Sequence, residues 1–485
     1  MNLIFFSARA TYRYFSSKAT RKGATCYPPT SKIKEKGFDI LYSKPKRGGI
    51  KWNQEQLQVL DAISKGKSVF VTGSAGTGKT LLVQHIIKLL RKVHGRSGVY
   101  VTASTGIAAC ALNGCTLHSF AGIGLGEASA EELLHKVNSN RTALHRWKEA
   151  KVLIIDEISL ISGEVFDKLE FIARKIRSEP GSHGEMIWGG IQLVGSGDFH
   201  QLPPIFDNNT NKFAFEASSW NMVFDMQIDL TAVFRQSDPR LIKLLRGIRT
   251  GTYDSEDLKL LESRCSDLEA DPLAVKLFPR TDDVDRVNRM HLESLHKDLI
   301  GYRAFDSGIW KEGLRTGIAP DYVELCVGAR VMLTKNLDSR GKLVNGAAGT
   351  VVSFEFVNGI DKTLGTNWLP VVKFDFGSDE LIIGPETWEL TDGREKVATR
   401  KQIPLILAWA LSVHKSQGMT INSLSTNLNR SFGYGMVYVA LSRVKTLEGL
   451  HLSSFDPGKI MVHPKVLKFY GSLGNQQDQN ICVQK

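Results

Sequence analysis

The chain has 485 residues, of which 42% are hydrophobic, 23% charged and 9% aromatic. This length corresponds to about three domains and allows large cores to be buried without disulfides. The composition excludes a mainly disordered, collagen-like or coiled-coil protein. The longest apolar run, residues 403–413, is too short to span a membrane, so we expect a soluble protein with no membrane partner.

The six cysteines include no CxxC pair. They therefore predict neither a disulfide framework nor a zinc site, and they suit a reducing compartment. The net charge is +12, but residues 1–34 contain seven basic residues and no acidic one, which leaves 55 basic and 50 acidic residues in the rest. Net charge therefore favours a nucleic-acid partner only weakly.

Residues 1–34 are rich in Arg, Ser and Thr and interleave these with aromatic residues. This pattern is typical of a mitochondrial transit peptide, which we place at residues 1–35, with a linker at 36–50. A disordered basic tail is the alternative, and the basic run Lys44–Arg47 leaves nuclear import open. We expect a mitochondrial location.

From Lys51 onward, β-branched runs alternate with helical patterns. They predict strands at 68–72, 99–103, 152–156 and 192–197, and helices at 80–93, 106–112 and 163–177. Such alternation implies an α/β fold with a mostly parallel sheet. Between about 326 and 399, short Val- and Phe-rich runs separated by turn dipeptides predict a small all-β insert. The α/β pattern resumes at Pro404, and the polar residues 471–485 predict a disordered tail.

A phosphate-binding loop is predicted between the first strand and the first helix. Its sequence is Gly73-Ser74-Ala75-Gly76-Thr77-Gly78-Lys79-Thr80. The glycines let backbone N–H groups wrap the phosphates of ATP at a positive helix end. Lys79 is expected to neutralise the β- and γ-phosphates, and the Thr80 hydroxyl to bind Mg²⁺.

Two adjacent carboxylates end the strand 152–156. Asp156 is expected to hold the Mg²⁺ shell, and Glu157 to polarise the attacking water. Phosphoryl transfer also needs cations at the transition state. Arg235 and Arg443 are the candidates, and both lie far downstream, where they could reach ATP only from a second α/β domain.

The ordered series of motifs between Trp52 and Tyr470 resembles the Pif-type DNA helicases of superfamily 1B. Gln56 resembles the adenine-reading glutamine, and Gln201, in Gly197–Pro204, resembles the γ-phosphate sensor. Arg235 matches the fourth motif, and Arg443, in Tyr438–Arg443, matches the sixth, which carries the family's arginine finger. Segments 102–109 and 116–120 resemble the single-strand-contacting segments of the family, and segment 408–420 is similar to its fifth motif. Because grooves that follow a DNA backbone combine hydroxyl and cationic donors with stacking surfaces, we predict DNA contacts by Thr105, His118, Ser119, His414, Lys415 and Thr420.

Buried histidines that brace loops are the alternative reading of His118 and His414, and we expect Phe120 and Trp409 to be core residues rather than base-stacking ones. The resemblance implies two RecA-like P-loop domains in tandem, the second carrying an SH3-like insert. The first domain is predicted at 51–225, with a small insert near 113–150. The second domain is predicted in two parts, 226–325 and 401–470, and the SH3-like insert lies between them at 326–400.

The resemblance also implies the function. We expect an ATP-dependent DNA helicase, with Mg²⁺, that moves 5′-to-3′ on single-stranded DNA and unwinds forked or tailed duplexes in replication, repair, recombination and telomere maintenance. A fork, a G-quadruplex, an RNA–DNA hybrid and a telomere end stay open as substrates, and we expect a monomer. The alternatives are a P-loop ATPase that remodels protein complexes and a non-catalytic nucleic-acid-binding protein.

Overall fold

The computed structural model describes residues 50–178, 186–204, 212–265, 273–308, 319–337, 343, 345–358, 365–375, 379–392 and 395–482. The predicted transit peptide and residues 36–49 of the predicted linker lie outside these ranges. Within the described residues, no helix combines the length and the apolar character needed to cross a lipid bilayer.

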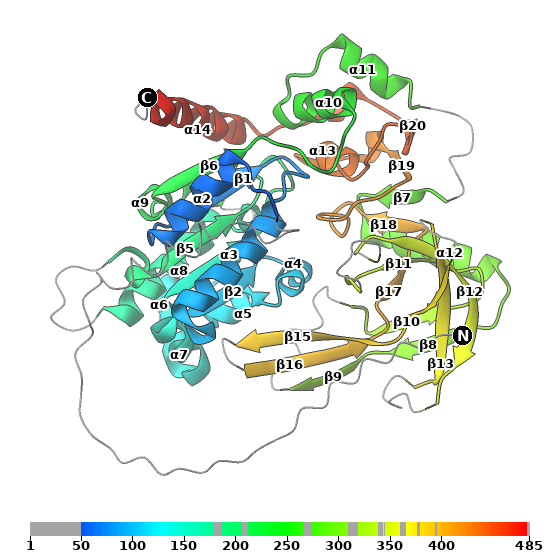
Figure 1. Ribbon diagram of the computed structural model, residues 1–485, viewed down its shortest axis with the longest axis horizontal. Helices are drawn as coiled ribbons and strands as arrows, with labels where there is room; N and C mark the ends of the chain where they lie inside the picture. Colours follow the sequence, from blue (N-terminus) through cyan, green and yellow to red (C-terminus); the bar gives the residue numbers. More distant parts are fainter. Residues whose placement is uncertain are drawn as a thin grey trace. The chain divides into compact units, whose positions relative to one another are not determined.

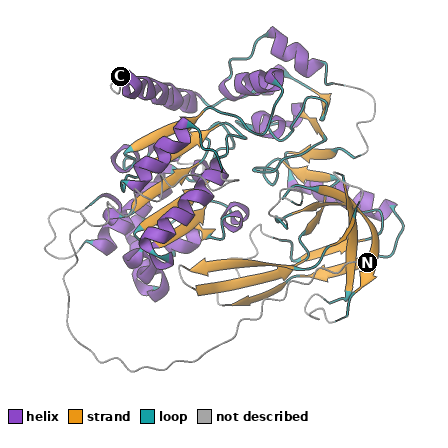
Figure 2. Ribbon diagram, viewed as in Figure 1, coloured by secondary structure: helices purple, strands orange, loops and turns teal. Residues whose placement is uncertain are grey.

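A six-stranded parallel sheet forms the first domain, in the order β3-β2-β4-β5-β1-β6. The strands are β1 (Val69–Gly73), β2 (Val99–Ala103), β3 (Cys115–Thr116), β4 (Val152–Asp156), β5 (Gln192–Ser196) and β6 (Met226–Leu230). Strands β1, β2 and β4 are buried along their whole length, as expected for a parallel sheet covered by helices. The predicted α/β fold is confirmed here (Figure 2).

The helices of this domain are α2 (Gln54–Ser64), α3 (Lys79–His94), α4 (Gly106–Ala111), α5 (Leu117–Ala121), α6 (Ala130–Ser139), α7 (Arg141–Glu149), α8 (Gly163–Arg177) and α9 (Trp220–Val223). Three of them, α3, α4 and α8, correspond to the predicted ones, and five more are present among the described residues. The insert predicted near 113–150 is mainly helical, because α5, α6 and α7 lie there. Capping boxes at Asn53 and Ser129 fix the starts of α2 and α6 by satisfying amides that have no partner within the helix.

The second domain has a four-stranded parallel sheet in the order β18-β7-β19-β20. Its strands and helices are α10 (Pro239–Thr250), α11 (Ser255–Glu262), β7 (Val275–Phe278), α12 (Thr281–Ser294), β18 (Ala410–Ser412), β19 (Leu424–Asn427), α13 (Met436–Leu441) and β20 (Leu450–Ser454). The sheet is interrupted in sequence between α12 and β18, where the β insert leaves and returns to the domain (Figure 1).

The β insert is longer than predicted. It extends from β8 to β17, residues 300–407, rather than from 326 to 400. Its strands are β8 (Ile300–Arg303), β9 (Phe305–Gly308), β10 (Tyr322–Leu325), β11 (Arg330–Leu333), β12 (Ala348–Phe356), β13 (Trp368–Phe374), β14 (Glu380–Ile382), β15 (Glu386–Asp392), β16 (Glu395–Gln402) and β17 (Leu405–Leu407). All its strand pairs are antiparallel. The short strands β8 and β9 lack strong alternation, so their sequences did not predict them.

One further boundary was wrong. Residues 226–230 were assigned to the second domain, but they form β6, which pairs with β1 of the first sheet. Within the predicted disordered tail, 471–485, helix α14 (Pro464–Cys482) continues to Cys482, and residues 483–485 lie outside the described ranges. Once a helix has started, each added residue gains a hydrogen bond at little cost, so the polar residues extend a helix that packing has begun.

Helix α14 returns from the second domain to the first, where it contacts β6 (Figure 1). Val466 belongs to the same buried core as Phe70 of β1, and the Phe469 ring stacks on Phe215 with 4.3 Å between centroids. These apolar contacts remove hydrocarbon from water and hold the end of the chain against the first sheet. Residues from both ends of the sequence therefore build the first domain.

Candidate active site between the two sheets

The predicted phosphate loop lies between β1 and α3. Gly78 precedes α3 with φ 82°, and no side chain caps that helix start. A bare helix N-terminus favours phosphate binding. The Lys79 Nζ donates hydrogen bonds to the carbonyl oxygens of Gly73, at 2.6 Å, and Ser74, at 3.0 Å. Burial lowers the pKa of Lys79, and the nearby Asp198 and Glu157 carboxylates oppose this effect. The cation is therefore held inside the loop.

Gln56 is buried at the start of α2, where its side chain accepts a hydrogen bond from the Asn53 amide at 3.1 Å. Its Nε2 lies 3.5 Å from the position that a Cβ on Gly78 would occupy. The residue is thus fixed beside the phosphate loop, and its reading of adenine stays a prediction.

The carboxylate pair lies at the end of β4. Glu157 has a left-handed backbone, with φ 51° and ψ 40°, which is uncommon for a residue with a side chain. Burial raises the pKa of Glu157 to about 7, and the neighbouring Asp156 charge adds to the increase. Burial also raises the pKa of Asp156. A carboxylate that titrates near neutral pH suits a base that takes a proton from water.

Gln201 and Asp198 follow β5 and lie side by side. The Gln201 Nε2 donates to the Asp198 carboxylate at 3.3 Å, whereas the buried Gln201 Oε1 has no hydrogen-bond partner among the described residues. Burial would raise the pKa of Asp198, but the Arg249 and Lys79 charges outweigh it and lower the pKa to about 2. The free Oε1 is an acceptor, so it suits a water molecule, which can donate a hydrogen bond to it.

Both predicted arginines bind backbone carbonyls of the second domain. Arg235 donates to the Ser442 oxygen at 3.0 Å, and Arg443 donates to the Val439 oxygen at 2.8 Å and the Ser416 oxygen at 3.3 Å. Burial, and then the Arg235 charge, lower the pKa of Arg443 to about 9. The two cations therefore lie near each other, and Arg443 is also within the field of the Glu157 carboxylate.

Three contacts join the second domain to the phosphate site. The Tyr438 hydroxyl of α13 accepts a hydrogen bond from the Ala75 amide at 2.8 Å. The Gln417 Nε2 donates to the Glu157 carboxylate at 3.1 Å. The Arg235 side chain packs against Gly76 so closely that a Cβ added to Gly76 would lie 2.6 Å from the Arg235 Cβ. The structure therefore brings the predicted Lys79, Asp156, Glu157, Gln201, Arg235 and Arg443 into one site.

Five residues in or beside this site were not predicted: Asp198, Gln417, Tyr438, Arg249, and Tyr470, whose hydroxyl lies 3.4 Å from Asp198 Oδ1. Gln417 and Tyr438 stand inside the segments that resemble family motifs, so the motifs offered a signal for them. Arg249 and Tyr470 lie on amphipathic helices, where nothing in the sequence separates them from ordinary helix residues. Their contacts depend on tertiary structure.

The residues present fit a magnesium ion bound with ATP. The described residues contain no cluster of three or more His, Cys, Asp or Glu side chains that could hold a metal alone. The Thr80 hydroxyl and the Asp156 carboxylate supply oxygen donors. Mg²⁺ commonly takes one or two such protein ligands and completes its shell with phosphate oxygens and waters.

The DNA candidates of the first domain follow adjacent strands. Thr105 is exposed after β2, and His118 and Ser119 are half-buried on α5, after β3. Burial lowers the pKa of His118, so the neutral form is favoured near pH 7. Strand β15 of the insert contacts α4 and β3 at this edge. Phe120 is fully buried, as predicted for a core residue.

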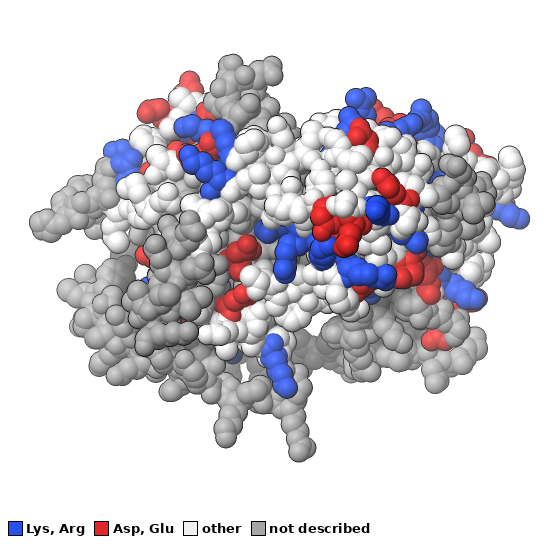
Figure 3. Space-filling view, turned by 90° about the horizontal axis from the view of Figure 1, so that it is seen from above, with Lys and Arg blue, Asp and Glu red and all other residues white. Residues whose placement is uncertain are grey.

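The candidates of the second domain lie after β18. His414 and Lys415 are exposed, and Thr420 is half-buried. The insert comes close to Thr420, because a Cβ added to Gly346 would lie 3.2 Å from the Thr420 backbone carbonyl oxygen. Trp409 packs against the core of the insert and stacks on His291 at 5.5 Å. On the face seen in Figure 3, the acidic and basic side chains of the described residues are interspersed.

Comparison with known proteins agrees with this geometry. Residues 51–257 match the PIF1-like helicase family, and residues 314–354 match the 2B domain of the DNA helicase Pif1. The ATP-dependent DNA helicase PIF1 of Emericella nidulans is 41% identical over 479 residues, covering 87% of this chain and 63% of that protein. The protein of the same name from Xenopus laevis is 41% identical, covering 90% of this chain and 66% of that protein. The chain thus spans less than two thirds of the length of these relatives.

Solved structures give the same result. The Pif1 helicase of Candida albicans is 38% identical, covers 87% of this chain and 100% of its own, and has a TM-score of 0.70. Bacteroides Pif1 in complex with ADP-AlF4 is 28% identical, with coverage of 88% and 98% and a TM-score of 0.75. A Bacteroides Pif1 bound to single-stranded DNA is 26% identical, with coverage of 88% and 98% and a TM-score of 0.59. These matches and the site geometry show that the chain belongs to the PIF1-like helicase family.

Proposed function

We propose that this protein is an ATP-dependent DNA helicase that couples ATP hydrolysis to 5′-to-3′ movement along single-stranded DNA. The observation that carries the proposal is the set of contacts across the site: Tyr438 to Ala75, Gln417 to Glu157, and Arg235 against Gly76. Because both domains contribute to the ATP site, a change in bound nucleotide changes how the domains fit together. The candidate DNA residues lie on the same two domains and would move with them.

The partner is single-stranded DNA, including the tails of forked or tailed duplexes. Support comes from the relatives, which are named ATP-dependent DNA helicases, and from the Bacteroides Pif1 structure bound to single-stranded DNA. A further similar structure is described as the basis for unwinding of forked double-stranded DNA by two coordinating Pif1 helicases. Direction of travel follows from the family resemblance. A monomeric state, a mitochondrial location and a role in genome maintenance belong to the same proposal.

The chemistry follows from the positions of the side chains. Lys79 binds the β- and γ-phosphates, and the Glu157 carboxylate takes a proton from the water whose oxygen attacks the γ-phosphorus. The bond to the bridging oxygen then breaks, and ADP leaves with the electron pair. Arg443 and Arg235 stabilise the negative charge that this exchange develops. When bound through Thr80 and Asp156, Mg²⁺ would neutralise phosphate charge.

Strand displacement on tailed duplexes tests the proposal. The full chain should unwind a duplex with a 5′ single-stranded tail in the presence of ATP, and it should leave a duplex with a 3′ tail intact. Lys79→Ala serves as the inactive control, because it removes the cation from the phosphates. Unwinding of the 3′-tailed duplex alone would contradict the direction, and ATP hydrolysis with neither duplex unwound would favour a protein-remodelling ATPase.

A further inference from the structure

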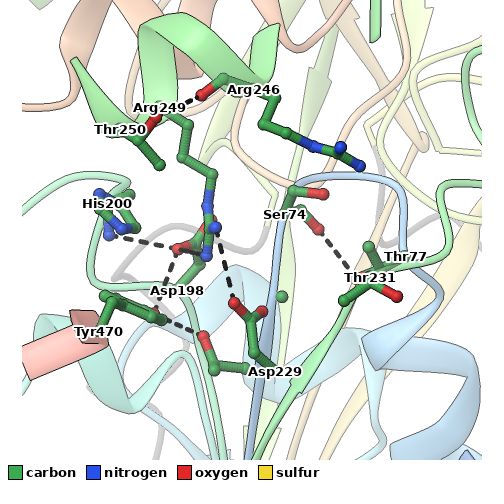
Figure 4. Close-up of polar contacts among 12 residues, drawn as sticks. Ser74, Thr77, Asp198, His200, Asp229, Thr231, Arg246, Arg249, Thr250 and Tyr470 are labelled. Atoms are coloured by element: carbon green, nitrogen blue, oxygen red, sulfur yellow. Dashed lines mark hydrogen bonds and ion pairs between the residues drawn. The ribbon is translucent and has the colours of Figure 1, made fainter. Parts of the chain in front are cut away.

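A cluster of polar side chains, of which Asp198 and Arg249 are buried and Asp229 and Tyr470 half-buried, joins the end of α10, the first sheet and α14. We call Asp198, Asp229, Arg249 and Tyr470 the latch cluster. The Arg249 Nη2 and Nε lie 3.0 and 3.4 Å from the two Asp198 oxygens, and Nη1 lies 3.8 Å from Asp229 Oδ2. The Arg249 and Asp198 side chains are 9% and 0% exposed. Figure 4 shows the Arg249 guanidinium between the two carboxylates.

Tyr470 completes the cluster from α14. Its hydroxyl lies 2.5 Å from the Thr72 Oγ1 and 3.4 Å from Asp198 Oδ1, and it accepts a hydrogen bond from the Phe199 amide at 3.2 Å. Its ring stacks on His200 with centroids 4.4 Å apart, and the Arg249 guanidinium carbon lies 5.0 Å from the ring centre. One tyrosine therefore contacts the end of β1, the loop after β5 and α10.

The cluster ends at the ATP site. Asp198 receives the hydrogen bond from Gln201 Nε2 at 3.3 Å, and this bond leaves the buried Gln201 Oε1 free for a ligand. Asp198 is also the carboxylate that acts most strongly on the buried Lys79. The orientation of Gln201 is therefore set by an aspartate that Arg249 and Tyr470 hold from outside the first sheet.

We propose that Arg249 and Tyr470 are positioning residues for ATP hydrolysis, which fix Asp198 so that it orients Gln201 and leaves Lys79 to the phosphates. The inference rests on the proposed ATPase function. Because Arg249 comes from the second domain and Tyr470 from the C-terminal helix, Gln201 is aligned only when both elements are seated. Among the described residues, Lys79 is the cation that acts most strongly on the buried Asp198 after Arg249, so loss of Arg249 would leave Lys79 as its main partner.

Tyr470→Phe tests the proposal, because it removes one hydroxyl and keeps the ring. At saturating single-stranded DNA, we expect kcat for ATP to fall about three- to tenfold, the effect of one lost hydrogen bond, with KM for ATP nearly unchanged. Phe469→Leu is the matched control, since it weakens packing of the same helix. It should lower Tm more than Tyr470→Phe does and lower kcat less.

A double-variant cycle separates positioning from general destabilisation. If Tyr470 acts through Gln201, then Tyr470→Phe should cause no further loss of kcat in a Gln201→Ala background. Arg249→Lys should retain more activity than Arg249→Gln. Arg249→Gln should also raise KM for ATP, because Asp198 would then compete with the phosphates for Lys79. An unchanged kcat in Tyr470→Phe, or an equal loss in both backgrounds, would overturn the inference. Absence of ATP hydrolysis in the unmodified protein would instead refute the proposed function.

Discussion

At the scale of single residues, Glu157 links the two domains most directly. Its carboxylate belongs to the first sheet, has a raised pKa, and accepts a hydrogen bond from Gln417, which lies 260 positions away in the sequence. The acidic pair at the end of an apolar strand was predictable from local pattern. The bond from Gln417 was not, because it depends on how two distant segments meet.

The raised pKa of Glu157 predicts an acid limb in the pH dependence of ATP hydrolysis. A base must be deprotonated, so activity should be full above a pH of about 7 and should fall as the pH drops through that value. The measurement is kcat/KM for ATP between pH 5.5 and 9 at constant Mg²⁺. A profile that stays flat down to pH 5.5 would show that no base with this pKa limits the reaction.

At the scale of elements, the start of α13 controls the fit between the domains. Gly435 precedes this helix with φ 73°, and a Cβ there would collide with the Gln201 carbonyl oxygen. Helix α13 also carries Tyr438, which contacts the phosphate loop. A glycine at this position therefore allows the second domain to approach the loop after β5.

Gly435→Ala should disturb this approach. The left-handed backbone alone costs about 1 kcal/mol or more for alanine, and the clash adds to it, so both Tm and the rate of ATP hydrolysis should fall. Gly433→Ala is the matched control, because its Cβ would meet only the flexible Met436 side chain, at 3.3 Å. Equal rates and equal Tm values for the two variants would contradict this role of α13. Thermal unfolding and steady-state ATP hydrolysis measure the two effects.

The elements with strong sequence patterns were predicted well. The strand at 99–103 and the helix at 163–177 have the predicted bounds, because both combine clear periodicity with clear end signals. Strand β6 was assigned to the wrong domain, since pairing with β1 is a property of the sheet. The C-terminal part of α14 was missed because its polar sequence gives no apolar periodicity.

At the scale of the whole molecule, the chain crosses between the domains repeatedly. It leaves the first sheet after β6, builds the second sheet around the β insert, and returns through α14 to the core of the first domain. The motifs predicted the tandem α/β arrangement and the shared ATP site. They could not predict the return of α14 or the latch cluster, which depend on burial and on contacts between distant segments.

We propose that this site hydrolyses ATP in response to single-stranded DNA. The most direct measurement is steady-state ATP hydrolysis by the full chain, with and without a single-stranded oligonucleotide. Lys79→Ala should abolish the activity, whereas Lys88→Ala, an exposed lysine on the same helix, should leave it unchanged. We predict strong stimulation by the DNA. Hydrolysis that the DNA does not stimulate, or that persists in Lys79→Ala, would contradict this account.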